Sequence, residues 1–346
     1  MYKVIKLSKE VTELIENSVF KDCSLNAVFR IVLNGFNTYS NVFLERLSMG
    51  YSPAPRQYVS VKIDSDLVER FDKVVSYINR ERRIVTRSFT MLKMLEHYLN
   101  PIKEVVLTIN VKGYRCKDSD LIERLKAVAV QLNNLMPDIV FLQEVRIGED
   151  KKILERLLNN LSARYFPVLP VSFNSELDYN ACVCIALVRN DLMKKCKILR
   201  IGNEGREWKH RYNKLQISDR IYMNVWIQQT FGSSNENTRA IAEDMWQVVL
   251  SEAELYTNVD TAYYLLGDLN SCQDVFGREL GLLSEKLVNT KCNSDFNTPT
   301  CALNILDYAF ANRYAIQKNK VITRIFQPSM RELMISDHEA LVMTIS

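Results

Sequence analysis

The sequence predicts an α/β (α+β) protein in two parts, and two observations carry this prediction. A strand–helix–helix pattern occurs twice within the first hundred residues, at a constant offset of 56. From about residue 104 the pattern changes to apolar strands that alternate with helices and longer polar loops. We therefore expect a small domain over residues 1–100 and a larger one over residues 104–346.

The composition is that of an ordinary globular protein. Hydrophobic residues make up 47% and charged residues 25% of the 346-residue chain. Apolar runs are too short to span a membrane, and the N-terminus lacks the apolar centre of a secretion signal, so we expect no membrane partner and a cytoplasmic location. The eight cysteines include no C-x-x-C pair, so free thiols are expected. With only three histidines and no zinc-ligand spacing, a zinc site is not expected.

The net charge of +4 lies in the first hundred residues. They hold 15 Lys and Arg against 11 Asp and Glu, whereas the remainder carries 30 of each. This excess is modest, but it indicates a polyanionic partner for the first part of the chain.

Each copy of the repeat reads as a short alternating strand followed by two helices. The stretch "YKVIKLSKEV" (2–11) aligns with "YVSVKIDSDL" (58–67). Ser8 and Asp64 end these strands and are the expected N-caps of first helices over about 9–20 and 65–79. Alternation directs the apolar side chains inward, toward the helices: Ile5, Leu7, Val61 and Ile63.

This repeated order resembles the ribbon-helix-helix family of DNA-binding proteins. The resemblance implies that the two strands pair within one chain as an antiparallel ribbon that enters the major groove, so that the protein can be monomeric. The outward-facing residues would then contact double-stranded DNA: Tyr2, Val4, Lys6, Tyr58, Ser60 and Lys62. A small helical dimerisation module with merely solvated Tyr and Lys side chains is the alternative interpretation.

The stretch "YYLLGDLNS" (263–271) is an apolar run that stops on polar residues. We expect a buried strand, a sharp turn at Gly267, and Asp268 and Asn270 pointing the same way. Taken alone, an ordinary turn is the better interpretation, because Gly, Asp and Asn are common turn residues.

Other apolar strands of the larger part are also expected to end in acids. The joint presence of these acids favours a functional site over an ordinary turn. Glu144 follows "DIVFLQ", while Asp307 and Asp337 lie in "NILDYAFAN" and "MISDHEALV". Together with Asn110 and His338, these acids predict a cluster that converges on one rim of the fold.

Five ordered motifs, "TIN", "DIVFLQEV", "GDLN", "LDYAF" and "SDH", resemble the endonuclease/exonuclease/phosphatase (DNase I-like) superfamily over residues 104–346. The resemblance implies a four-layered α/β/β/α sandwich of two mixed sheets. The activity it implies is divalent-metal-dependent cleavage of a phosphate ester. Oxygen ligands for Mg²⁺ or Mn²⁺ would come from Glu144, Asn110 and Asp337.

The resemblance also assigns roles in catalysis. Asp268 would accept the proton of the attacking water, and Asn270 would orient that water. His338 would hydrogen-bond the phosphate, and Asp307 would hold its imidazole and raise its pKa.

Two positions depart from the family pattern. Trp226, in "MNVWIQQ", stands where the family has a histidine or a tyrosine. An indole can donate one hydrogen bond but cannot shuttle a proton, so Trp226 contacts the phosphate as a donor, Gln228 or Gln229 substitutes for it, or activity is reduced. It could also be an ordinary core aromatic. Lys112 is the second departure, because the abasic-site branch often has an acid there.

The sequence therefore predicts a Mg²⁺-dependent phosphodiesterase, a DNA endonuclease or exonuclease tethered to DNA by its N-terminal module. The alternative is a DNA-binding regulator or accessory protein whose phosphoesterase domain has lost turnover, a reading that Trp226 motivates. An RNA or small-molecule phosphatase is favoured less, because the chain shows no sign of a lipid or inositol clamp.

Overall fold

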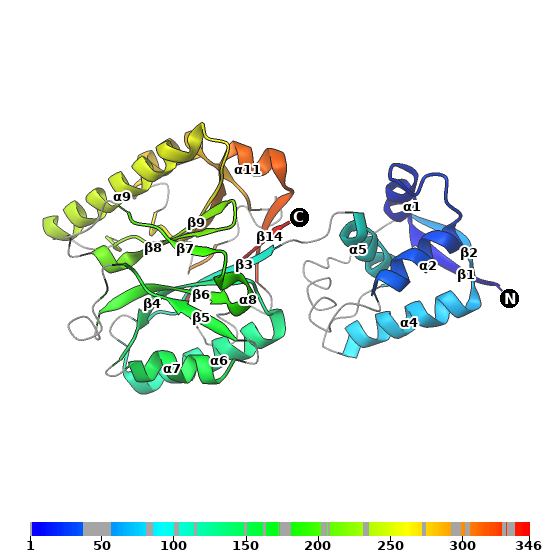
Figure 1. The fold of residues 1–346 in the computed structure, drawn as a ribbon, viewed down its shortest axis with the longest axis horizontal. Coiled ribbons are helices and arrows are strands. Elements are labelled where there is room, and N and C mark those ends of the chain that lie inside the picture. Colours follow the sequence, from blue (N-terminus) through cyan, green and yellow to red (C-terminus); the bar gives the residue numbers. More distant parts are fainter. Residues whose placement is uncertain are drawn as a thin grey trace. The chain divides into compact units, whose positions relative to one another are not determined.

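The computed structural model divides the chain into two compact units, Met1–Ile102 and Lys103–Ser346 (Figure 1). The residues described are 2–36, 57–80, 86–99, 104–113, 116–148, 151–161, 164–171, 173, 181–201, 206, 208–230, 235–271, 275–291, 299–301, 305–326, 330 and 336–346. Of the helices in these ranges, none combines the length and the apolar character that crossing a membrane requires.

The first unit is a two-stranded antiparallel ribbon packed on helices. Its elements are β1 (Tyr2–Ser8), α1 (Lys9–Glu16), α2 (Leu25–Phe36), β2 (Tyr58–Asp64), α4 (Ser65–Arg80) and α5 (Arg87–Leu99). Lys6 lies opposite Ser60 and Val4 opposite Lys62. The expected alternation is confirmed, because the inward residues Ile5, Leu7, Val61 and Ile63 are all buried. Their neighbours Tyr2, Val4, Lys6, Tyr58, Ser60 and Lys62 are all exposed.

Two equivalent hydrogen bonds join the copies of the repeat crosswise. The Ser8 N–H donates to Ser88 Oγ (2.9 Å) in the first turn of α5. The Asp64 N–H donates to Asn26 Oδ1 (2.9 Å) in the first turn of α2. Each strand is thus held by the second helix of the other copy, so the two copies form one interlocked core.

Two local expectations for the first copy need correction. Ser8 occupies the N-cap position of α1, but its side chain makes no capping hydrogen bond and its buried Oγ has no partner in the described structure. The Ser8 backbone N–H is instead used by Ser88. Helix α1 ends at Glu16 rather than near residue 20, because Asn17 follows in a non-helical conformation.

The second unit contains two six-stranded mixed sheets. The first sheet, in spatial order, comprises β13 (Val321–Ile325), β14 (Leu341–Ile345), β3 (Glu104–Asn110), β4 (Ile139–Arg146), β6 (Cys182–Arg189) and β5 (Tyr165–Val168). The second comprises β11 (Val288–Asn289), β12 (Asp307–Ala311), β10 (Ala262–Asp268), β9 (Arg220–Trp226), β8 (Tyr212–Ile217) and β7 (Cys196–Ile198). One pair in each sheet is parallel, β3–β4 and β9–β10, so both sheets are mixed.

Helices cover the outer faces of the two sheets, which confirms the expected four layers (Figure 1). The outer helices are α6 (Asp118–Leu135), α7 (Lys152–Asn159), α9 (Glu236–Thr257) and α10 (Gly277–Lys286), whereas α8 (Asn190–Met193) and α11 (Arg313–Lys318) pack against the core between the sheets. The core of α9 and α10 against the second sheet centres on Trp246, which is fully buried. Between the sheets, the stacked rings of Tyr222 and Tyr264 have centroids 5.1 Å apart.

The polar residues lie at one rim of the sandwich, as expected, but not all of them lie at the ends of strands. Asp307 begins β12 and Asp337 precedes β14, so neither acid ends a strand. These strands run antiparallel to β10 and β3, which brings their starts to the ends of those strands. Asp307 is therefore the direct neighbour of Asp268 across the sheet.

Two further expectations at this rim were wrong in detail. β4 does not end on Glu144 but continues to Arg146, and the register shift between Leu142 and Val145 places Glu144 in a bulge with φ 57°. Gly267 is not a turn, because it is paired inside β10. A Cβ there would lie 2.0 Å from the Val225 carbonyl oxygen, so only glycine lets the two strands approach this closely.

Candidate active site

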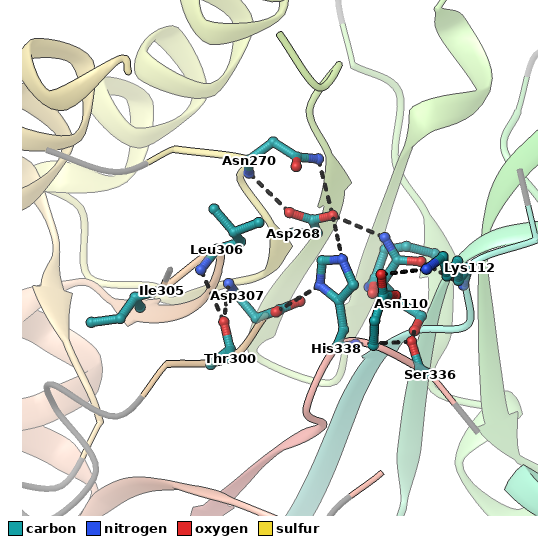
Figure 2. Close-up of polar contacts among 12 residues, drawn as sticks. Asn110, Lys112, Asp268, Asn270, Thr300, Ile305, Leu306, Asp307, Ser336 and His338 are labelled. Atoms are coloured by element: carbon teal, nitrogen blue, oxygen red, sulfur yellow. Dashed lines mark hydrogen bonds and ion pairs between the residues drawn. The ribbon is translucent and has the colours of Figure 1, made fainter. Parts of the chain in front are cut away.

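Asp268, the last residue of β10, is the centre of the rim cluster (Figure 2). It is fully buried, with 0% of its surface exposed. Its Oδ1 accepts a hydrogen bond from the Asn270 N–H (2.9 Å). Its Oδ2 accepts from Asn270 Nδ2 (3.0 Å) and from Asn110 Nδ2 (2.9 Å). Asn270 reaches back because its backbone is left-handed, with φ 45°, and not because the strand continues as we had expected.

His338 lies between two buried carboxylates. Its Nδ1 is 2.9 Å from Asp307 Oδ2, and its Nε2 is 3.9 Å from Asp268 Oδ2 (Figure 2). Asp307 is fixed in turn, because its backbone N–H donates to Thr300 Oγ1 (2.9 Å). The structure therefore brings Asp268, Asn270, Asp307 and His338 together at one point.

The charges of these groups depend on one another. Burial raises the pKa of Asp268 to about 7, and Asp307 adds to this rise while His338 opposes it. Burial alone would lower the pKa of His338, but the carboxylates of Asp307 and Asp268 outweigh that effect and raise it well above its usual value. The two carboxylates therefore favour the protonated form of His338, and burial favours the protonated form of Asp268.

Asn110, at the end of β3, connects this centre to Glu144. Its Nδ2 donates to Glu144 Oε1 (2.8 Å) as well as to Asp268. Its Oδ1 accepts from the Lys112 N–H (2.8 Å), and its carbonyl accepts from Ser336 Oγ (2.6 Å). Gly113 allows the following segment to pass the bulge, since a Cβ there would lie 1.9 Å from the Glu144 carbonyl oxygen.

Asp337 is more exposed and lies in an ion pair. Lys112 Nζ is 2.5 Å from Asp337 Oδ2, with about half of each side chain exposed. The other carboxylate oxygen, Asp337 Oδ1, is buried without a hydrogen-bond partner in the described structure. Asn110 thus bonds Glu144 directly, and it is linked to Asp337 through Lys112. The unpartnered Asp337 Oδ1 and the side-chain oxygens of Glu144 and Asn110 are donors of the type that a hard divalent cation prefers.

The described residues contain two groups of three His, Cys, Asp or Glu side chains whose ligand atoms lie within 4.8 Å of one another. One consists of Asp268, Asp307 and His338, and the other of Cys301, Asp337 and His338. Glu144 belongs to neither group, so the predicted metal ligands Glu144, Asn110 and Asp337 stay a prediction.

Trp226 ends β9 beside Asp268 and is buried, with 4% exposed. The guanidinium of Arg211 lies 3.8 Å from the centre of its ring. Gln228 Nε2, by contrast, donates to the neighbouring Gln229 carbonyl (3.1 Å). Trp226 is therefore a platform for a cation, a geometry that the sequence did not predict.

Arg211 is the site residue that sequence reasoning missed. It lies at the end of the short helix η2 (Lys209–Arg211), and its carbonyl accepts from Cys184 Sγ (3.0 Å). Its Nη1 is buried without a hydrogen-bond partner among the described residues. Burial lowers the pKa of Arg211, and the nearby Glu144 carboxylate opposes this. In the sequence it is one basic residue in "WKHRYNK", with no spacing that distinguishes it.

Comparison with known proteins agrees with the described fold. The Endonuclease/Exonuclease/phosphatase family matches residues 107–338. Among solved structures, truncated Caenorhabditis elegans TDP2 is 19% identical with a TM-score of 0.50, over 70% of this chain and 97% of that chain. An AP endonuclease from Archaeoglobus fulgidus is 15% identical with a TM-score of 0.52, over 70% of this chain and 99% of that chain. Among curated proteins, none has a matching sequence.

Proposed function

The chain belongs to the endonuclease/exonuclease/phosphatase family, and we propose from this membership that residues 104–346 form a divalent-metal-dependent phosphodiesterase that cuts DNA, as an endonuclease or an exonuclease. The observation that carries the proposal is the buried Asp268, which faces His338 and Asp307 and is held by Asn110 and Asn270. This arrangement provides one base and one cation for a phosphate ester.

The side chains divide the chemistry between them. Asp268 accepts the proton of the attacking water, and Asn270 keeps the carboxylate and the water in position. The His338 imidazolium, oriented by Asp307, donates a hydrogen bond to a phosphate oxygen, where negative charge must be stabilised. Mg²⁺ or Mn²⁺ would be held by Glu144, Asn110 and Asp337. When bound, the ion polarises the phosphate and neutralises its charge.

Arg211 replaces the histidine or tyrosine that this chain lacks. Its buried Nη1 has no partner in the described structure, and an unpaired charged donor is costly unless a ligand satisfies it. The Trp226 ring holds the guanidinium in place from one side. We therefore assign to Arg211 a direct hydrogen bond to the scissile phosphate.

The N-terminal unit supplies a DNA-binding ribbon in this proposal. Three large side chains on its outer face are strongly exposed: Tyr2 by 65%, Val4 by 64% and Tyr58 by 49%. They share this face with Lys6, Ser60 and Lys62, a mixture suited to base edges and phosphates of double-stranded DNA. The crosswise bonds of Ser8 and Asp64 support a ribbon-helix-helix pseudo-dimer within one chain, which can act as a monomer.

A nuclease panel tests the activity. The purified chain, with Mg²⁺ or Mn²⁺, is incubated with supercoiled plasmid, single-stranded DNA and a duplex that contains an abasic site, and a chelator serves as the control. We expect cleavage of at least one substrate that the chelator abolishes. If none of the three substrates is cleaved, the proposal is contradicted.

Changing Lys112 should strengthen metal activation. In Lys112→Met, Asp337 no longer pairs with an ammonium, so less Mg²⁺ is needed for half-maximal cleavage. An exposed pair is worth about 0–1 kcal/mol, which corresponds to a decrease of up to about fivefold. The Mg²⁺ concentration for half-maximal cleavage is obtained by measuring the cleavage rate at increasing Mg²⁺ concentrations. Lys126→Met, which removes a similar exposed pair with Glu123, is the control and should change nothing.

The cleavage rate should rise with pH through about 7. Asp268 can accept a proton only when it is ionised, and burial raises its pKa to about 7. Protonation below that value therefore removes the base, and the rate falls on the acid side. Single-turnover rates from about pH 5 to pH 9, with DNA affinity measured in parallel, give the profile. A rate that is flat or decreases across this interval is inconsistent with Asp268 as the base.

The ribbon should contribute to DNA affinity through its lysines. Lys6→Ala combined with Lys62→Ala removes two phosphate contacts, so the slope of log affinity against log salt should decrease by about 2. Fluorescence anisotropy with a labelled duplex at several salt concentrations measures this slope. Lys9→Ala combined with Lys73→Ala, on α1 and α4, is the matched control. Equal losses in both double variants would argue against a ribbon interface.

A DNA-binding protein without turnover is the second candidate function. Two observations favour it: Asp268 has no exposed surface, and Lys112 pairs with Asp337 at the predicted metal position. Its signature would be DNA binding that depends on Lys6 and Lys62 together with no cleavage of any substrate in the panel.

A further inference from the structure

Cys301 lies beside the proposed active site without a role in the proposed reaction. It is a free, partly exposed cysteine that forms an isolated antiparallel bridge with His338. A short backbone hydrogen bond, from the Glu339 N–H to the Thr300 carbonyl (2.7 Å), joins the same two segments. The backbone thus fixes the thiol next to His338.

Three different ligand types meet at this place. The Cys301 Sγ, a carboxylate oxygen of Asp337 and a ring nitrogen of His338 all lie within 4.8 Å of one another. In addition, Asp337 Oδ1 is buried and has no hydrogen-bond partner in the described structure. A cation bound here would satisfy that oxygen.

The chemistry of the three donors selects the cation. Sulfur and imidazole nitrogen favour Zn²⁺ and Cd²⁺, whereas Mg²⁺ and Mn²⁺ prefer oxygen. Three protein ligands also leave the fourth tetrahedral position of Zn²⁺ open. The carboxylates of Asp268 and Asp307, which face His338, would compensate the charge of a divalent ion bound there.

We propose that Cys301, Asp337 and His338 form a Zn²⁺ site whose occupation inhibits the enzyme. Bound Zn²⁺ would take Asp337 from the Mg²⁺ ligands and His338 from the phosphate. A zinc site was not expected from residue spacing, because Cys301 and His338 meet only through the pairing of separate segments. The Zn²⁺ affinity does not depend on the proposed function, and only the inhibition rests on it.

The binding test uses the full-length protein, reduced and free of metal. Zn²⁺ affinity is measured by competition with a chromophoric chelator, and Cd²⁺ is added separately to detect the ultraviolet sulfur-to-cadmium charge-transfer band. In Cys301→Ser we expect the tightest Zn²⁺ site to weaken by more than about tenfold, since even outer partners of a ligand contribute about 10–100-fold. The intensity of the Cd²⁺ charge-transfer band should decrease by the contribution of one bound thiolate.

Cys23→Ser is the matched control, because Cys23 is a free, exposed cysteine in the other unit. It should bind Zn²⁺ as the unaltered protein does. Equal affinity in Cys301→Ser and the unaltered protein would overturn the proposal, as would equal weakening in both variants. Circular dichroism and thermal unfolding establish that both variants are folded.

Inhibition is tested separately, with Mg²⁺ in excess. Micromolar Zn²⁺ should slow cleavage by the unaltered protein and by Cys23→Ser, while Cys301→Ser keeps its Mg²⁺-dependent rate and resists Zn²⁺. If no substrate is cut at all, the proposed function fails and the chelator competition still decides whether the site exists. Equal inhibition of all three proteins would overturn the inhibitory role.

Discussion

Asp268→Asn is expected to lower the rate of DNA cleavage by about 10²–10⁴-fold, because an amide cannot accept the proton of the attacking water. The substitution keeps the shape of the side chain, so the strand end and its neighbour Asp307 should stay in place. Because Asn110 and Asn270 donate three N–H groups to this carboxylate, the amide also loses at least one of these bonds. Single-turnover cleavage at saturating metal measures the change.

The matched control for this variant is Asp260→Asn. Asp260 is exposed and lies just before the opposite end of the same strand, β10. It receives the same chemical change, and we expect an unaltered rate. DNA affinity should be equal in both variants, since the ribbon is untouched. A cleavage rate in Asp268→Asn within a few-fold of the unaltered protein would remove Asp268 from the chemistry.

Arg211→Ala is expected to lower cleavage by about 10²–10³-fold, the usual cost of losing one donor to a developing negative charge. Arg211→Lys should recover only part of this, because an ammonium cannot reproduce a planar guanidinium stacked on Trp226. The loss should appear in kcat more than in KM, because the hydrogen bond strengthens as charge develops.

Arg206 offers a control of the same kind outside the site. Its guanidinium lies 5.2 Å from the centre of the Trp208 ring, and it pairs with Asp244. Arg206→Ala therefore breaks a comparable arginine–tryptophan contact and should leave the rate unchanged.

Trp226→Phe separates the two roles of the indole. A small effect on the cleavage rate means that the ring supports Arg211. A loss as large as that of Arg211→Ala means that the indole N–H is itself the donor.

The strands, the helices and the polar residues of the rim could be predicted from local patterns, whereas the four layers were implied by the family resemblance. Apolar strands and amphipathic helices are visible in alternation and spacing, and the rim residues lie in five short motifs. The placement of Asp307 and Asp337 could not be derived in this way. They precede their strands, and only antiparallel pairing with β10 and β3 brings them to the rim.

The contacts that the sequence missed are tertiary. Glu144 lies in a bulge, Arg211 at the end of η2 stacks on Trp226 of β9, and Cys301 reaches His338 across an isolated bridge. None of these contacts has a fixed sequence spacing, since each depends on how two distant segments pack. Side-chain types were therefore predictable at this site, while their partners were not.

The crosswise bonds of the ribbon unit have a consequence for how it assembles. Each half lacks the helix that secures its own strand, so a half produced alone would have to find a second molecule before it could fold, and dilution would unfold it. Joining the halves in one polypeptide makes the pairing unimolecular. A chain present in only a few copies per cell would still hold its ribbon together.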